Sequence, residues 1–377
     1  MTKPLRVGFN ARLLSSGTTR GWNRYLVNLL AELPALGAEL FLYSHLPPHE
    51  NHMRNLPAGA YQVRVSKPMT YLAWQEYWLP RQCREDALDI FHSPFHYGLP
   101  WRADCACVLT MHDAIGLHPL APLLSPHVWA YHAMARARAD HIVTISRYSR
   151  ADLMRAFGIP KSQITVTYLA AQRAFHEITE GTGQKFPGLC GAAAPYVLYY
   201  GGWEERKNVP FLVRAFAATR APGLQLVLAG GSDAERTAVR GLVDCLGIAG
   251  RVRLLGILDD ADLPGLCAGA LCFAYPSRHE GFGLQVCEAM AAGCPVLVAR
   301  ATSLPEVLGD GGASFSLDDP HELTQLLQRM ASNTDWRATL SRKAKERSRT
   351  FSWHTTAVKT LQEVYPLALR ARQAKRS

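Results

Sequence analysis

Short runs of apolar, often β-branched residues alternate in the first half of the chain with longer stretches whose apolar residues recur at helical spacing. This is the pattern of strands joined by crossover helices in a parallel sheet. Residues 24–33 and the Ala- and Arg-rich residues 127–139 are expected helices. The expected strands are residues 6–11, 39–43, 62–65, 89–92, 106–111 and 141–145. The pattern predicts a doubly wound α/β domain.

A segment rich in Gly, Ala and Pro, from about residue 180 to 195, interrupts this pattern and has the composition of an interdomain linker. A second series follows, with strands expected at 196–200, 224–228, 252–255, 271–275 and 296–298 and helices at 208–219, 234–246 and 284–292. Residues 353–373 are long enough for about five helical turns that reach back to the first domain.

The chain of 377 residues therefore suits two domains. We expect a first domain at residues 1–180, a linker at 181–195, a second domain at 196–352 and a C-terminal helix at 353–377 that crosses back to the first domain. Ligands of open parallel sheets bind beyond the carboxyl ends of the strands, so the function is expected between the two domains.

Composition supports a folded protein, since 48% of residues are hydrophobic and 19% are charged. The N-terminus lacks the form of a signal peptide, and no segment reaches the ~18 apolar residues of a spanning helix. We expect a cytoplasmic protein, or one bound peripherally to the inner face of the cell membrane. The nine cysteines are scattered, and several lie within apolar runs, which indicates reduced core residues. No metal site is expected.

The formal net charge of +10 suits anionic lipid, nucleic acid or a phosphorylated substrate. No nucleic-acid motif accompanies it, and we expect no nucleic-acid partner. Trp74, Tyr77 and Trp78 are expected to be exposed aromatic residues, which together with the charge fit a lipid-linked acceptor at a membrane surface.

The densest chemical signal lies in residues 276–295, where an expected strand ends, a glycine-bearing turn follows and a helix opens. Gly281 and Gly283 permit close approach of the backbone, and the helix N-terminus presents N–H groups that can hold a diphosphate. Glu280 precedes these glycines, and Glu288 returns to the same helix face about two turns later. For either Glu alone, a solvated carboxylate is the plainer alternative.

Residues 280–296 resemble the signature of the retaining glycosyltransferases of family 4, the group 1 glycosyltransferases. That signature is Glu, seven intervening residues and Glu, with Gly-Phe-Gly after the first Glu and Glu-Ala-Met-Ala-Ala-Gly-x-Pro-Val from the second. The resemblance covers nearly the whole chain and implies a GT-B fold of two Rossmann-like domains, with a nucleotide-sugar donor held mainly by the second. It implies a sugar contact for Glu280 and a ribose contact for Glu288.

The same resemblance implies further donor contacts in the second domain. Residues 255–257 resemble the turn whose backbone meets the nucleobase. The implied donor-binding residues are Gly256, Ile257, Gly281, Phe282, Gly283, Leu284 and Glu288, with Gly17 and Gly21 contributed by the first domain. Gly17 and Gly21 belong to a loop that resembles the family's glycine-bearing loop after the first strand, although a plain flexible turn explains it equally.

Residues 200–208 add a basic element after the first strand of the second domain. Arg206 and Lys207 can neutralise a leaving nucleoside diphosphate; a solvated basic turn is the alternative. The commonest family form has Arg at the position of Gly202, so it is open whether Arg206 replaces that guanidinium.

In the first domain, His112 follows a strand and resembles the family histidine near the donor sugar; a hydrogen-bonded strand-end histidine is the alternative. His92, His96 and Ser146 match family positions expected on the acceptor side. Ser146 equally fits a helix N-cap.

We expect a retaining, metal-independent hexosyltransferase in cell-surface polysaccharide or glycoconjugate biosynthesis, with no cofactor beyond its donor substrate. Arg206-Lys207-Asn208 favours GDP-mannose by family likeness, followed by UDP-hexoses. The acceptor is expected to be a glycan or a lipid-linked glycan. The residues 260–262, Asp-Ala-Asp, indicate a helix cap rather than a metal clamp. A nucleotide-sugar epimerase and a catalytically silent partner subunit remain as alternatives.

Overall fold

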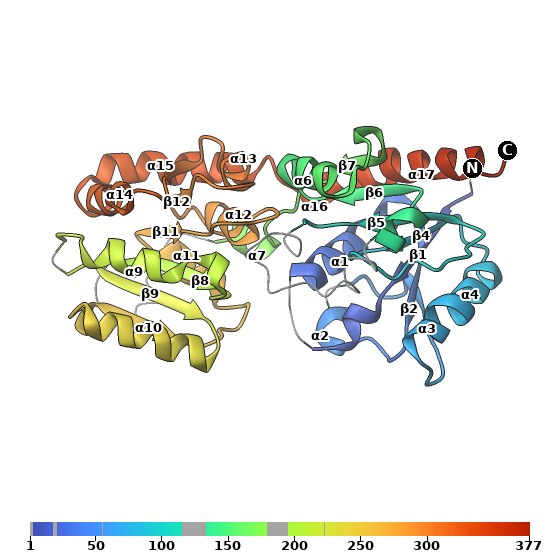
Figure 1. Cartoon of the computed structure of the whole chain (residues 1–377), viewed down its shortest axis with the longest axis horizontal. Coiled ribbons are helices and arrows are strands. Elements are labelled where there is room, and N and C mark those ends of the chain that lie inside the picture. The colour runs from blue at the N-terminus through green and yellow to red at the C-terminus, as the bar shows by residue number, and fades with distance from the viewer. Residues whose placement is uncertain (1–2, 18–20, 55, 115–132, 179–194, 222) are drawn as a thin grey trace. The chain divides into compact units, whose positions relative to one another are not determined.

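The computed structural model describes residues 3–17, 21–54, 56–114, 133–178, 195–221 and 223–377. The chain forms two compact units, and each is described by itself. The first comprises Met1–Leu169 with Ser352–Ser377, and the second comprises Ala170–Phe351. Figure 1 shows that each unit has a central sheet with helices packed around it.

The first unit contains a seven-stranded parallel sheet in the order β3-β2-β1-β4-β5-β6-β7. The strands are β1 (Leu5–Asn10), β2 (Ala38–Ser44), β3 (Tyr61–Val65), β4 (Ile90–Ser93), β5 (Ala106–Thr110), β6 (His141–Thr144) and β7 (Ile164–Val166). The helices are η1 (Arg12–Ser15), α1 (Gly21–Glu32), η2 (Pro34–Leu36), α2 (Glu50–Met53), α3 (Tyr71–Ala73), η3 (Trp74–Trp78), α4 (Leu79–Glu85), α6 (Arg147–Phe157), η5 (Lys161–Gln163), α16 (Trp353–Lys359), η9 (Thr360–Val364) and α17 (Tyr365–Ala374).

The second unit contains a six-stranded parallel sheet in the order β10-β9-β8-β11-β12-β13. The strands are β8 (Tyr196–Gly201), β9 (Gln225–Gly230), β10 (Val252–Leu255), β11 (Cys272–Tyr275), β12 (Val296–Ala299) and β13 (Gly312–Phe315). The helices are α7 (Arg173–His176), η7 (Glu205–Lys207), α9 (Val209–Ala217), α10 (Asp233–Cys245), η8 (Ala249–Arg251), α11 (Leu263–Gly269), α12 (Leu284–Ala291), α13 (Leu304–Leu308), α14 (Pro320–Ser332) and α15 (Thr334–Ser348).

Both sheets have the Rossmann strand order, which reverses direction between β1 and β4 in the first unit and between β8 and β11 in the second. Ligands of such sheets bind outside the carboxyl ends of the strands at this reversal. The expected fold class, two doubly wound Rossmann-like domains, is confirmed. The expected strands lie within one or two residues of the observed ones, whereas β7 and β13 are not among them.

The unit boundaries differ in detail from the expected domains. The first unit ends at Leu169 rather than at residue 180, because α7 packs against α11 and α12 of the second unit. The expected linker at 181–195 lies outside the described residues except for its last residue, as does the first half of the helix expected at 127–139. From Ser352 onward the chain packs on the first unit, with α16 against α1 and α17 against β4, β5 and β6.

Two helices of the first unit contain a π-helical turn, and both turns end two residues before a proline. η3 precedes Pro80 and η9 precedes Pro366. Proline has no N–H and its ring clashes with the carbonyl group four residues earlier, so the regular hydrogen bond is lost. The helix is widened at these points, and it continues beyond them as α4 and α17.

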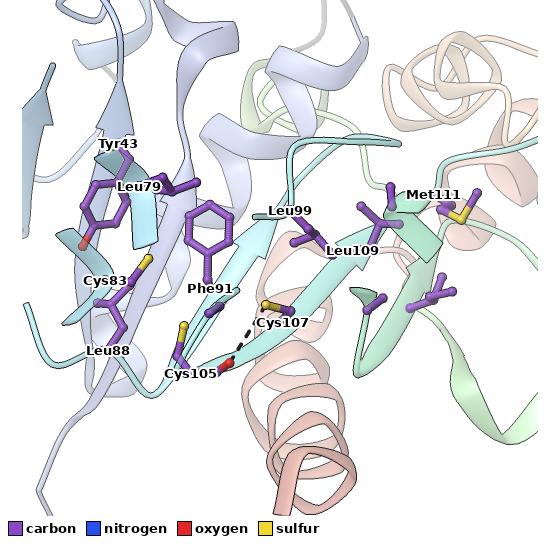
Figure 2. Close-up of a cluster of buried hydrophobic side chains, with 14 of the residues drawn as sticks. Tyr43, Leu79, Cys83, Leu88, Phe91, Leu99, Cys105, Cys107, Leu109 and Met111 are labelled. Atoms are coloured by element: carbon purple, nitrogen blue, oxygen red, sulfur yellow. Dashed lines mark hydrogen bonds between the residues drawn. The ribbon is translucent and has the colours of Figure 1, made fainter. Parts of the chain in front are cut away.

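A large apolar cluster fills the space between the first sheet and its helices (Figure 2). Phe91, Cys107 and Leu109 come from the strands, and Trp74 and Leu79 come from the helical segment beside them. Trp74 is fully buried, so the expectation that it is exposed was wrong. Tyr77 is the exposed aromatic residue of this segment, and Trp78 is partly buried against the cluster.

The cysteines agree with the reduced core residues expected from the sequence. Eight of them are free, and all of these except Cys245 are buried. Burial raises the pKa of the Cys272 and Cys287 thiols to about 12, which keeps them protonated. Within the described part of the chain, no helix is long and apolar enough to cross a membrane.

Candidate active site

Two loops of the second unit meet at the point where its strand order reverses. One follows β8 and contains η7, and the other follows β11 and leads into α12. The carbonyl oxygen of Arg206 accepts hydrogen bonds from the backbone N–H of Arg278 at 2.7 Å and from the Ser277 hydroxyl at 3.2 Å. The backbone of one loop therefore fixes the backbone of the other, so that side chains from both loops meet.

An ion pair between Lys207 and Glu280 lies at the centre of this arrangement. Lys207 Nζ lies 2.6 Å from Glu280 Oε1, and both residues are more than nine-tenths buried. The same carboxylate oxygen accepts a hydrogen bond from the Tyr275 hydroxyl at 3.0 Å, while Lys207 Nζ donates to that hydroxyl at 2.7 Å. Arg206 Nη1 is 3.4 Å from Glu280 Oε1. One carboxylate thus holds two cations beside a tyrosine.

The surroundings determine the charge states of this pair. Burial by itself raises the pKa of Glu280, but Lys207 and Arg206 outweigh it and lower the pKa. Burial lowers the pKa of Lys207, and this is opposed by Glu280. The carboxyl of Glu280 is therefore ionised and oriented before any ligand binds.

The backbone of Glu280 is held as firmly as its side chain. Its N–H donates to Thr302 Oγ1 at 3.0 Å, and its carbonyl oxygen accepts a hydrogen bond from the Ser303 hydroxyl at 2.9 Å. Both partners belong to the segment between β12 and α13. Three segments of the second unit therefore converge on this one residue.

Gly283 is the N-cap of α12 and has a φ of +93°, in the left-handed region that favours glycine. A Cβ atom at this position would lie 2.8 Å from Leu304 Cδ2, so glycine also allows the close packing of α13. α12 starts directly behind this turn, and its first N–H groups and dipole favour an anion. Gly281 and Phe282 complete the turn and are buried.

Glu288 lies on α12 and is fully buried. Its Oε2 accepts a hydrogen bond at 2.8 Å from the hydroxyl of Tyr200, which lies near the end of strand β8. The two carboxylates of the signature are thus each bonded to a tyrosine from a strand end. Sequence reasoning missed Tyr200 and Tyr275, although both are strand-terminal tyrosines directly before the two loops.

The remaining donor-side residues lie at the same end of the second sheet. Gly256 follows β10, and its carbonyl oxygen accepts from the Gly230 N–H at 2.9 Å. Ile257 is 88% exposed, which is unusual for so apolar a side chain. Leu284 is the first residue of α12 and is partly buried. Asp262 occupies the N-cap position of α11, but its side chain makes no capping bond, contrary to expectation.

In the first unit, His112 follows β5 and is 3% exposed. Its Nε2 lies 2.9 Å from the carbonyl oxygen of Pro94, which can only accept, so Nε2 carries the proton and Nδ1 offers a lone pair. Burial, with the charge of His96, lowers the pKa of His112 to about 4 and keeps the ring neutral. His96 accepts the His112 backbone N–H at 3.2 Å, and Trp22 stacks on the His112 ring at 6.1 Å.

His92 has a different environment. Its Nδ1 lies 3.1 Å from the Tyr365 hydroxyl and its Nε2 lies 2.7 Å from Thr110 Oγ1. The ring is fully buried, and burial lowers its pKa to about 3. Both ring nitrogens of His92 are therefore engaged between β4, β5 and α17, and its acceptor-side role stays a prediction.

The other residues predicted in the first unit have clear local roles. Ser146 is the N-cap of α6 and accepts the Ser149 N–H at 2.8 Å, as its alternative reading expected. Gly21 begins α1, and a Cβ on Gly17 would lie 3.0 Å from the His49 ring. The loop residues 18–20 between these glycines lie outside the described residues.

Two family models match the chain. Residues 190–347 match "Glycosyl transferases group 1", and residues 19–171 match "Glycosyltransferase Family 4". The O-antigen chain mannosyltransferase B of Escherichia coli is 32% identical over 293 residues, which cover 72% of this chain and 73% of that protein. The chain belongs to the group 1, family 4 glycosyltransferases.

Other relatives of this glycosyltransferase agree with that assignment. The MMP alpha-(1->4)-mannosyltransferase of Mycolicibacterium hassiacum is 30% identical over 238 residues, covering 60% of this chain and 54% of that protein. Among solved structures, Anabaena Alr3699/HepE in complex with UDP superposes with a TM-score of 0.78 at 20% identity, covering 96% of this chain and all of that one. The latter likeness supports the GT-B fold.

Proposed function

We propose that this glycosyltransferase moves mannose from a nucleoside-diphosphate sugar, GDP-mannose in the first instance, to a hydroxyl of a glycan or lipid-linked glycan. The reaction retains the configuration of the sugar, requires no metal ion and belongs to cell-surface polysaccharide biosynthesis. The observation that carries the proposal is the buried Lys207–Glu280 pair, which is held between Tyr275 and Arg206 close to the start of α12.

Leaving-group stabilisation is the first role of this site. Breaking a glycosidic bond to a nucleoside diphosphate builds negative charge on the phosphate oxygens. Lys207 and Arg206 supply positive charge, and the N–H groups behind Gly283 supply donors with a favourable dipole. Because these groups are fixed before the reaction, little reorganisation is needed when the charge develops.

Orientation of the sugar is the second role. The Glu280 carboxylate, oriented by Lys207 and Tyr275 at Oε1, is a strong acceptor for sugar hydroxyls. For His112 of the first unit, a contact with the donor sugar is proposed from the family resemblance alone, and its neutral ring has an acceptor nitrogen. We assign Glu280 to positioning rather than to covalent attack, since its charge is already committed to two cations. Retention then follows if the acceptor hydroxyl attacks the anomeric carbon on the face that the diphosphate leaves and gives its proton to the leaving phosphate oxygen.

We assign the ribose of the donor to Glu288, and its base to Gly256 and Ile257. A carboxylate suits paired ribose hydroxyls, and the Tyr200 hydroxyl orients that of Glu288. The exposed Ile257 side chain offers an apolar surface to a flat base. The choice of mannose rests on the named activities of the E. coli and M. hassiacum relatives and on Arg206-Lys207-Asn208.

The donor is tested with the full chain in a thermal-shift screen of nucleotide sugars. A specific donor at about 100 times its dissociation constant stabilises by ~2.7 kcal/mol, and unrelated nucleotide sugars do not. Transfer to a mannose-containing glycan is then followed by NMR, which reads the anomeric configuration of the product. An inverted product refutes retention, and a rate that collapses with EDTA refutes metal independence.

Variants test the assigned residues. Glu280→Gln and Lys207→Met should lower turnover by roughly a hundredfold or more, since each removes preorganised charge from the site. Arg300→Gln, which breaks an exposed ion pair with Glu322 at 2.7 Å elsewhere in the unit, serves as the matched control. Donor turnover without acceptor would favour an epimerase instead. Donor binding without any turnover would favour a silent partner subunit.

A further inference from the structure

The first unit contains a pocket of about 720 Å³ that the assigned site residues do not line. It lies between the helical segment α3–η3–α4, the loop that follows β4 and the helical residues 134–138. Its volume is in the range of small-molecule sites. The π-helical turn η3 contributes several of the lining residues, and π-turns often occur at functional sites.

One part of the lining is apolar and open to solvent. Leu72 is 63% exposed, Tyr77 78%, Trp101 60% and Met134 41%. These side chains come from three separate segments of the chain, yet they line a single pocket. Large apolar side chains that gather in this way mark binding surfaces more often than isolated ones do.

The second part of the lining is cationic. Arg84, Arg102 and Arg138 line the pocket together with one acid, Glu76. Glu76 is already engaged, because its Oε1 is 3.1 Å from Arg138 Nη1 and its Oε2 accepts the Trp101 backbone N–H at 2.7 Å. The pocket therefore carries an excess of positive charge.

Several guanidinium donors remain for a ligand. Arg102 makes no hydrogen bond or ion pair within the described residues, and Arg84 has only an exposed pair with Asp104 at 3.6 Å. Arg138 lies over the Trp101 ring, 4.4 Å from its centroid, and its buried Nε has no hydrogen-bond partner among the described groups. An unsatisfied buried donor is costly, and an anion would satisfy it.

We propose that this pocket binds a phosphate group carried on a hydrocarbon chain, namely the lipid-phosphate anchor of the acceptor. Inorganic phosphate would use the arginines and leave the apolar side chains in water, and a neutral lipid would do the reverse. A ligand with both parts uses both walls of the pocket. The identity of the ligand as part of the acceptor rests on the proposed function, whereas its binding needs no donor site.

Binding is tested on the full chain by calorimetry with farnesyl phosphate below its micelle concentration. Farnesol and inorganic phosphate should each bind at least about tenfold more weakly, because each lacks one half of the recognised chemistry. The double variant Arg84→Gln, Arg102→Gln should weaken farnesyl phosphate binding by about tenfold or more. Arg81→Gln is the matched control, since Arg81 is exposed on the same helix α4 but does not line the pocket.

A second pair of variants tests the apolar wall. Leu72→Ser should weaken farnesyl phosphate binding, and Leu46→Ser, at another exposed leucine that does not line the pocket, should not. The proposal is overturned if the double variant, Arg84→Gln with Arg102→Gln, binds farnesyl phosphate as tightly as the control Arg81→Gln does. The proposal is also overturned if the protein does not bind farnesyl phosphate but binds phosphatidylglycerol vesicles, and if none of the four variants changes that vesicle binding. The positive charge would then serve a bilayer surface.

The two proposals fail separately. If farnesyl phosphate does not bind while a nucleotide sugar still raises the melting temperature, the pocket assignment falls and the donor assignment stands. If farnesyl phosphate binds and no nucleotide sugar does, the pocket stands and the proposed transfer reaction falls.

Discussion

Replacement of Lys207 by Met removes the main counter-charge of a buried carboxylate while keeping the length of the side chain. In the wild-type protein, Glu280 Oε1 has three donors, at 2.6 Å from Lys207, 3.0 Å from Tyr275 and 3.4 Å from Arg206. The variant loses the shortest of them. It retains Tyr275 and the longer contact with Arg206.

The size of the effect follows from this geometry. Loss of one partner of a buried ion pair typically costs about 3–5 kcal/mol, because the other charge is left uncompensated. Arg206 remains within reach of Glu280, so we expect the lower end, about 3 kcal/mol at pH 8. In a unit of about 150–250 residues, each kcal/mol shifts the melting temperature by roughly 2–4 °C, which gives about 6–12 °C.

The loss of stability caused by Lys207→Met should depend on pH, and the pKa of Glu280 determines the direction. In the wild-type protein the folded pKa of Glu280 lies below its ordinary 4.5, so the stabilisation is complete above the unfolded pKa and is lost as pH falls through the folded pKa. Without Lys207, burial dominates and raises the folded pKa of Glu280. Protonation then relieves the buried charge, and the penalty of Lys207→Met should shrink between pH 8 and about pH 5.

The assay is thermal and urea unfolding of wild type, Lys207→Met and the double variant with Glu280→Gln at pH 8 and pH 5. The double variant carries no buried charge at either position, and it should be more stable than Lys207→Met at pH 8. Arg300→Met, in an exposed pair, should cost no more than about 1 kcal/mol at both pH values. The reasoning is refuted if Lys207→Met is equally destabilised at both pH values and Glu280→Gln restores nothing.

Further predictions concern the remaining site residues. Tyr200→Phe removes the 2.8 Å bond to Glu288 and should cost about 1–3 kcal/mol in urea unfolding while raising the KM for the donor more than it lowers kcat. Gly283→Ala should destabilise by roughly 1–3 kcal/mol in the same assay, because φ is +93° and Leu304 lies 2.8 Å from the new Cβ. Since the pKa of His112 is lowered to about 4, wild type and His112→Asn should have the same shape of rate profile between pH 6 and 8; a histidine inflection present only in wild type would contradict this. Dialysis against EDTA should leave the transfer rate unchanged, as measured by nucleoside-diphosphate release.

The periodicity of the sequence predicted the strands well because both sheets are parallel and buried on both faces. Buried parallel strands are continuous apolar runs, such as Ala106–Thr110 and Val296–Ala299, and such runs are easily recognised in a sequence. β13 was missed because Gly312–Phe315 is short, begins with glycine and is only partly buried, so it lacks such a run.

The exposure of Trp74 was predicted wrongly for a physical reason. Trp74, Tyr77 and Trp78 were all expected to be exposed. The direction of each side chain, however, depends on the helical turn that carries it. The π-turn before Pro80 changes that direction, so Trp74 lies in the core and Tyr77 lies in solvent. Periodicity at 3.6 residues cannot anticipate this change.

The site was predictable where a motif carried it and not where it depended on packing. Glu280 and Glu288 stand out in the sequence by their spacing, whereas the tyrosines that orient them are far less conspicuous. Tyr200 lies 88 residues from its partner Glu288, so no local pattern joins them. Tyr275 is only five residues from Glu280, but their contact depends on the turn that brings the chain back.

The place of the usual family arginine is the point at which structure adds most to the sequence. A Cβ atom on Gly202 would lie against the carboxylate of Glu204, so a larger residue at 202 would require this exposed side chain to move. Arg206 instead reaches the Glu280 carboxylate from η7, four residues further along, and also donates to the His279 carbonyl oxygen at 3.1 Å. Its guanidinium thus shares one carboxylate with Lys207. A leaving diphosphate needs positive charge beside its phosphate oxygens, and we propose that Lys207 and Arg206 supply it. That Arg206 takes the role of the usual family arginine stays a prediction.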